Sequence, residues 1–196
     1  NGGLLTLHAG SGTGTLAGII SGTNSSLTKS GAGTVALSAA NTYTGNTTVT
    51  GGTLQIAGSG SLGSGNYSGT ISLSSGTTLQ YSSSATQTLS GVISGSGSLI
   101  KDTNTATLKL TNTNTYSGTT TISAGTITLS GSSGALSGTS GITINGLTYN
   151  SGSTLKLDNT TANTNRINDS ATVTFNGGEL VLSNTTSTDN ESTRIY

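Results

Sequence analysis

An internal repeat constrains what this chain can fold into more than any other feature of its 196 residues. Residues 35–56 return without a gap as residues 108–129, at an offset of 73, and 9 of the 22 aligned positions are identical. The flanking segment 16–22 returns as 89–95 at the same offset. Self-similarity at a fixed long period is typical of solenoids, in which each structural unit stacks on the previous one.

Short runs that alternate apolar with small or polar residues occur along the whole chain. Ten of them are residues 5–7, 35–37, 54–56, 71–73, 79–81, 108–110, 127–129, 142–144, 155–157 and 173–175. A period of two, closed by Gly, Ser or Asn, is the pattern of a half-buried β-strand. Thr and Val dominate these runs, and both favour extended backbone. No stretch has helical periodicity, so the sequence predicts an all-β protein.

The composition excludes several classes of function. Thr, Ser, Asn and Gly make up 122 of the 196 residues, and charged residues are only 6%, against about 25% in a typical soluble domain. A net charge of zero leaves no field to attract nucleic acid or an anionic membrane. The absence of Cys excludes disulfides and thiolate metal sites. No apolar run approaches the roughly 20 residues of a membrane-spanning helix.

These features together predict a parallel β-helix. Its interior takes Leu, Ile, Val and Ala, its exterior takes Thr and Ser, and its corners take Gly or Asn. A 73-residue period corresponds to about three coils, and the whole chain to eight or nine coils in a rod on the order of 40 Å long. A β-sandwich fits the number of strands, but it fits the repeat and the scarcity of large aromatic residues less well.

The expected organisation is a single β-solenoid segment over residues 1–196. Related units lie at about 16–56 and 89–129, and a divergent unit lies at about 166–196. The divergent unit opens with Arg166-Ile167, a pair that recurs as Arg194-Ile195.

One stretch resembles a known family. Residues 27–45, continuing to 52–54, are similar to the autotransporter-associated β-strand repeat, which characterises the passenger regions of large bacterial surface proteins. The second copy, 99–127, departs from that repeat, because residues 102–106 replace the Gly-Ala-Gly turn at 31–33. The resemblance implies a right-handed β-helix, export through the outer membrane, and display as a stalk in the extracellular space or at the bacterial cell surface.

Candidate catalytic residues are few. Alternation turns His8, the single histidine, outward from a terminal strand. The acids are Asp102, Asp158, Asp169, Glu179, Asp189 and Glu191. Glycoside hydrolysis requires a pair of carboxylates on one wall, and the spacings of 11 and 10 between Asp158, Asp169 and Glu179 do not match a coil. We therefore expect no catalytic residue, no metal, no cofactor and no enzyme activity.

The residues that recur in the repeat are expected to serve the fold. They are Asn41, Tyr43, Gly45, Gly52, Asn114, Tyr116, Gly118 and Gly125. We expect the two Asn residues to form stacked side-chain ladders or left-handed corners. The two Tyr residues should cover a coil end or corner with the hydroxyl in water, and a sugar-stacking platform is the functional alternative. Lys29 and Lys101, which are also equivalent, are expected to be solvated exterior charges.

The sequence predicts a non-catalytic structural or adhesive stalk segment of an exported bacterial surface protein or extracellular fibre. The alternative is a carbohydrate-binding or polysaccharide-processing β-helix domain; ice binding through Thr-x-Thr pairs is a third possibility. Expected partners are neighbouring solenoid segments, copies of the chain end to end, and host or matrix glycans or proteins. Neither end of the sequence resembles a solenoid cap, so we expect continuation past at least one end, or end-to-end joining at the C-terminal edge, where Arg194 opens an uncompleted repeat.

Overall fold

The computed structural model describes residues 2–146, 152–161, 163 and 165–184. This part of the chain contains strands and one short 3-10 turn, Gly63–Gly65, and no α-helix. The strands are β1 Leu4–His8, β2 Thr13–Leu16, β3 Ser26–Ser30, β4 Thr34–Leu37, β5 Thr47–Val49, β6 Thr53–Gly58, β7 Asn66–Tyr67, β8 Ile71–Leu73, β9 Thr78–Ser83, β10 Gln87–Leu89, β11 Ile93–Gly95, β12 Ser98–Leu110, β13 Thr113–Asn114, β14 Thr120–Leu129, β15 Ala135–Leu136, β16 Gly141–Asn145, β17 Thr154–Asn159, β18 Thr172–Asn176 and β19 Glu179–Asn184. Among the described residues no helix is long and apolar enough to cross a membrane.

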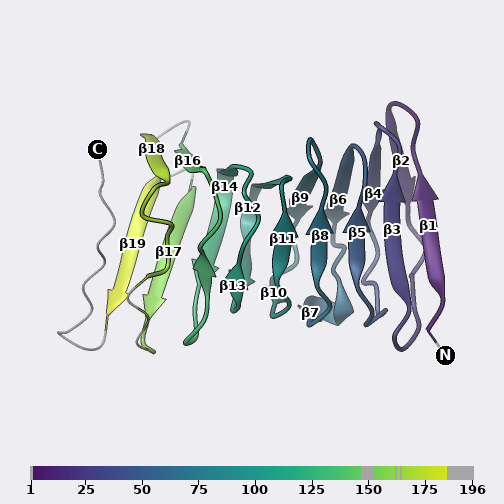
Figure 1. Ribbon diagram of the computed structural model, residues 1–196, viewed down its shortest axis with the longest axis horizontal. Coiled ribbons are helices and arrows are strands. Elements are labelled where there is room, and N and C mark those ends of the chain that lie inside the picture. The colour runs from purple at the N-terminus through teal and green to yellow at the C-terminus, as the bar shows by residue number, and fades with distance from the viewer. Residues whose placement is uncertain (1, 147–151, 162, 164, 185–196) are drawn as a thin grey trace.

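The strands follow one another along a rod, from β1 near the N-terminus to β19 near the C-terminus (Figure 1). Each strand pairs in parallel with a strand one coil earlier or later. The longest path of paired strands, β2-β4-β6-β9-β12-β14-β16-β18, contains eight strands, one for each coil. The predicted all-β parallel β-helix, with about eight coils, is confirmed.

The paired strands form three stacks. Stack A is β1-β3-β5-β8-β11. Stack B is the eight-strand path above, and stack C contains β7, β10, β17 and β19. β12 and β14 belong to both stacks B and C: their first halves pair with β9 and β16, and their second halves with β10 and β17. One coil therefore visits A, B and C in turn.

The 73-residue repeat is longer than three coils. Along stack A, Thr28 pairs with Thr48, Thr48 with Ser72 and Ser72 with Ser94. These three coils take 66 residues, so the repeat exceeds them by seven residues, about a third of a coil. The expectation of three coils per repeat was therefore slightly wrong, and each copy is moved by one stack. Lys29 lies in stack A, and its equivalent Lys101 lies in stack B.

The interior consists of apolar columns in which each residue packs on its register partner in the next coil. One column in stack B is Val35, Leu54, Leu79, Leu99, Thr120, Ile142 and Val173. Its members are buried. The corresponding column in stack A is Leu5, Leu27, Thr47, Ile71 and Ile93. A buried threonine interrupts each aliphatic column, at the equivalent positions Thr47 and Thr120.

The corner between stacks A and B requires left-handed backbone in two successive coils. Gly52 has φ +61° and Gly76 has φ +72°. A Cβ on Gly52 would collide with the carbonyl oxygens of Gly33 and Ala32 in the preceding coil, whereas a Cβ on Gly76 would meet no atom within 4 Å. The two glycines share a backbone conformation and differ in how closely the neighbouring coil approaches.

This pair separates backbone strain from coil spacing. Gly76→Ala should lower the free energy of unfolding by about 1 kcal/mol, because only the left-handed conformation is penalised. Gly52→Ala should cost about 3 kcal/mol or more, because the coils must also move apart. Urea denaturation followed by far-UV circular dichroism measures both losses. Equal losses would contradict the role assigned to the close approach.

Candidate functional site

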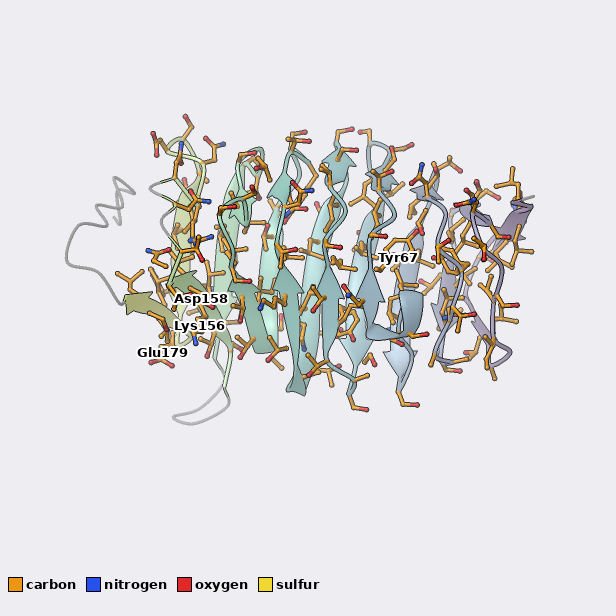
Figure 2. The ribbon with its side chains drawn as sticks, turned by 90° about the horizontal axis from the view of Figure 1, so that it is seen from below. Tyr67, Lys156, Asp158 and Glu179 are labelled. Atoms are coloured by element: carbon orange, nitrogen blue, oxygen red, sulfur yellow. The ribbon has the colours of Figure 1, made fainter. Side chains whose placement is uncertain are left out.

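The acidic residues do not assemble into a catalytic pair. Asp158 and Glu179 lie on neighbouring strands of stack C, with Lys156 between them (Figure 2). The sequence argument against a shared face was wrong for these two acids, because the β17–β19 coil is 25 residues long at this point. However, Glu179 pairs with Thr154 and Asp158 pairs with Ser183, so the acids are offset along the strands by four residues, about 13 Å.

The other titratable candidates are isolated from one another. His8 is exposed on β1, and its Nδ1 lies 3.2 Å from Ser30 Oγ. Asp102 is half-buried and accepts a hydrogen bond of 2.6 Å from Gln80 Nε2. Asp169 is exposed in a turn, while Asp189 and Glu191 lie outside the described residues. Among the described residues, no group of three or more His, Cys, Asp or Glu could hold a metal ion.

Asn41 joins three consecutive coils. Its side-chain oxygen accepts a hydrogen bond of 2.9 Å from the Ile20 amide in the coil before. Its Nδ2 donates to the carbonyl oxygens of Ala39, at 2.9 Å, and of Ser61 in the coil after, at 3.2 Å. A single buried amide side chain therefore connects the backbones on both sides of it.

Asn114 makes the same contacts in the next copy of the repeat. Its side-chain oxygen accepts from Ile93 N at 2.9 Å, and its Nδ2 donates to Asn112 O at 2.8 Å and Ala135 O at 3.1 Å. The expectation of ladders or left-handed corners was wrong. The two Asn residues are three coils and one stack apart, and neither is among the described residues with positive φ.

Tyr43 belongs to a buried chain of hydroxyl groups. Its hydroxyl lies 2.7 Å from Thr47 Oγ1, which lies 2.8 Å from the Tyr67 hydroxyl, and Tyr67 donates in turn to the carbonyl oxygen of Gly45. The rings of Tyr43 and Tyr67 meet edge to face, with centroids 5.5 Å apart. Tyr67 is labelled on its coil in Figure 2. The threonine that interrupts the aliphatic column thus has a partner on either side.

The second copy builds the same chain with a different third member. The Tyr116 hydroxyl lies 2.6 Å from Thr120 Oγ1, which lies 3.1 Å from Thr139 Oγ1. Thr139 donates to the Gly118 carbonyl at 2.9 Å, as Tyr67 does to Gly45. Thr139 therefore replaces Tyr67.

Both repeat tyrosines differ from what the sequence suggested. Tyr43 and Tyr116 have no exposed surface, so the hydroxyls are not in water and the rings offer no platform for a sugar. Burial raises the pKa of both hydroxyls above the ordinary tyrosine value. The physical reason is that a tyrosine hydroxyl can enter the narrow interior when a threonine of the same coil meets it.

The repeat glycines lie where the coils approach most closely. A Cβ on Gly45 would collide with the Ser25 carbonyl of the previous coil, and a Cβ on Gly118 with the Gly97 carbonyl. Gly125, the equivalent of Gly52, has φ +73°, and a Cβ there would also lie 2.7 Å from Lys101 Nζ.

Lys29 and Lys101 are buried, so the expectation of solvated exterior charges was wrong. Neither side chain has exposed surface. Lys29 Nζ donates to backbone carbonyls of two corners, and Lys101 Nζ does so in the second copy. The alternation contained the signal: Lys29 is two residues from the buried Leu27, and Lys101 is two residues from the buried Leu99.

Arg166 is the functional residue of the fold that sequence reasoning missed. It has no exposed surface. Its guanidinium donates to Asn159 Oδ1 and to the carbonyl oxygens of Gly131, Gly134, Asp158 and Thr161. These acceptors come from the corners of two coils, so Arg166 joins the divergent unit to the coil before it. Its equivalent Arg194 and the rest of that unit from residue 185 lie outside the described residues.

The recurring polar residues are therefore interior connections between coils. Comparison with known proteins identifies the repeat that contains them. Residues 27–56 and 102–129 match the family of the passenger-associated-transport-repeat. These two segments are passenger-associated-transport repeats. The resemblance to autotransporter passenger regions that the sequence predicts is thereby confirmed.

A curated relative has the same character. The chain is 44% identical over 79 residues to the adhesin BmaC autotransporter of Brucella suis biovar 1 (strain 1330). The match covers 40% of this chain and 2% of that protein, so the chain spans a small fraction of the relative's length. No solved structure matches the chain.

The asparagine connection can be tested by deletion. Asn41→Ala should lower the free energy of unfolding by about 2–4 kcal/mol, because it leaves the buried Ile20 amide and Ser61 carbonyl without the partners described above. Asn66→Ala, which removes an exposed amide, should change it by less than about 0.5 kcal/mol. Similar losses in both variants, measured by urea denaturation, would show that Asn41 does not connect the coils.

The buried tyrosines predict a loss of stability in alkali. An unfolded tyrosine ionises near pH 10, whereas Tyr43 and Tyr116 keep their protons there because their folded pKa is raised. Their contribution is present below pH 10 and is lost as the pH rises above it, since only the unfolded chain releases protons. Unfolding midpoints between pH 9 and 11.5 should fall, and Tyr116→Phe should reduce the slope. If tyrosinate absorbance showed all six tyrosines ionising near pH 10 in the folded protein, the assignment would be wrong.

Proposed function

We propose that this chain is a non-catalytic stalk segment of an adhesin exported to the surface of a bacterium. The observation that carries the proposal is the use of its recurring polar residues: Asn41, Tyr43, Lys29 and their equivalents are spent inside the solenoid, connecting one coil to the next. The exterior is left with Thr, Ser and Asn and few charges. Such a rod extends by adding coils and needs no closed globular core.

Passage through an envelope suits this construction. Strands pair with partners only 20 to 24 residues away along stack A, so each coil can form on the previous one as the chain emerges. The absence of Cys avoids cross-links in an oxidising compartment. The name of the Brucella relative supports an adhesive role, and the proposed location is the cell surface or the extracellular space.

We also propose that a further solenoid coil packs on β1. Leu4 and Ile19 are 68% and 64% exposed at this end of the rod. With Leu5, Leu16 and Ile20 they line a cavity of about 440 Å³. A strand paired with the free edge of β1 would cover this apolar surface; it can come from a neighbouring segment or from another copy. The junction expected at the C-terminal edge falls outside the described residues.

Surface display and adhesion are tested on the cells that make the protein. Antibody raised against this segment should label intact, unpermeabilised cells, and its Fab fragment should reduce their attachment to host cells or to arrays of matrix glycans and proteins. Fab fragments against an unrelated envelope protein are the control. Labelling only after permeabilisation would contradict surface display, and unchanged attachment with full labelling would contradict adhesion.

The rival function is polysaccharide processing on the exterior of stack C. Incubation of the purified chain with bacterial, plant and host polysaccharides should release no product. Turnover that is lost on Asp158→Asn or Glu179→Gln would overturn the non-catalytic proposal, with Lys109→Gln as the control variant on the same stack.

A further inference from the structure

Three backbone carbonyls converge on one point at the corner after β3. The oxygens of Gly31 and Gly33 belong to this corner, and the oxygen of Gly51 belongs to the same corner of the next coil. Lys29 Nζ lies 2.5 Å from Gly31 O, 2.5 Å from Gly33 O and 2.8 Å from Gly51 O. Carbonyl dipoles that point at one position create a local site for positive charge.

The second copy of the repeat builds the same arrangement at a different corner. Lys101 Nζ donates to the carbonyl oxygens of Thr103 and Ala124, the latter at 3.3 Å, which are the positions equivalent to Gly31 and Gly51. It also lies 5.8 Å from the centroid of the Tyr81 ring, within the range of a cation–π contact. Because the repeat moves by one stack, Lys29 serves the A–B corner and Lys101 the B–C corner. The arrangement therefore belongs to the repeat and not to one face of the rod.

The groups that surround each ammonium are mainly neutral. The register partners of Lys29 are Leu7 and Val49, and the nearby His8 turns outward toward Ser30. The register partners of Lys101 are Tyr81 and Ile122. The neighbouring carboxylate of Asp102 binds Gln80. Backbone oxygens thus supply the hydrogen-bond acceptors of both ammonium groups.

We propose that each of these corners is a cation-binding site occupied by the repeat's own lysine, and that it binds a small alkylammonium ion when that side chain is shortened. The ligand must carry N–H donors in a compact cationic head, as methylammonium does, because the acceptors converge on one nitrogen. The site joins the corners of two coils, so its occupant stabilises the contact between them.

Burial changes the protonation of both lysines in a direction consistent with this site. It lowers the pKa of Lys29, and it lowers the pKa of Lys101 to about 8, although Asp102 acts to raise the latter. Between about pH 8 and the ordinary value of 10.5, folded Lys101 has lost a proton that the unfolded chain retains. Its contribution to stability therefore rises with pH across that window. The test below is made at pH 7, where both groups are charged.

The experiment compares Lys29→Ala and Lys101→Ala in methylammonium chloride, sodium chloride and tetramethylammonium chloride at equal ionic strength. In sodium chloride each variant should lose on the order of 5–10 °C in its unfolding midpoint, since several charge-assisted hydrogen bonds disappear. Methylammonium should recover at least a third of that loss. Tetramethylammonium, which has no N–H donor, should recover none. Lys156→Ala, on the exterior of stack C, should lose little and gain nothing.

Lys29→Met fills the space of the side chain without a cation, so it should be destabilised and methylammonium should not rescue it. A Lys29→Met variant as stable as the unaltered protein, or recovery of Lys29→Ala by all three salts alike, would overturn the proposal. If Lys29→Ala does not fold in sodium chloride, β-sheet circular dichroism after refolding in each salt is the readout. Folding in methylammonium alone supports the site, and folding in none of the salts contradicts it.

Discussion

The parallel backbone ladder between coils is the constraint on which the rest of this structure depends. It holds neighbouring strands about 4.8 Å apart, so every group that points inward must find its partner in its own coil or in an adjacent one. Aliphatic side chains satisfy this condition by stacking in columns such as Val35 on Leu54. Polar groups satisfy it only through connections that cross the same spacing, and Asn41, Thr47 and Lys29 each provide one. At the corners the spacing leaves room for glycine alone, as at Gly45.

The polar connections specify how the coils align, which the aliphatic columns cannot do. A column of Leu and Ile tolerates exchange between neighbours, because one apolar side chain packs much like another. The hydroxyl chain tolerates no slip, since it needs Tyr43 opposite Thr47 and a third hydroxyl in the following coil. The replacement of Tyr67 by Thr139 shows which property is essential. The third hydroxyl must reach the carbonyl of the repeat glycine, and a ring is not required.

Strand positions, fold class and the repeat could be predicted from the sequence, because alternation and self-similarity are local signals. The inward direction of Lys29 was also available in its spacing from Leu27, but the usual cost of a buried charge favoured the exterior, and only the convergence of distant carbonyls removes that cost. The equivalence of Tyr67 and Thr139 could not be predicted, since the two residues share neither chemistry nor repeat position. The roles of Arg166 and Asn41 were hidden for a related reason: backbone groups accept or donate most of their hydrogen bonds, and sequence does not encode where those groups lie.

The extra third of a coil in each repeat has a consequence for the shape of a longer stalk. Successive copies carry the same exterior residues to directions 120° apart around the axis of the triangular coil, so a run of repeats forms a three-start pattern along a screw. Three copies restore the original direction about ten coils further along. A stalk built this way presents no front or back. A receptor approaching from any side would meet the same surface, whatever the rotation of the rod about its attachment to the cell.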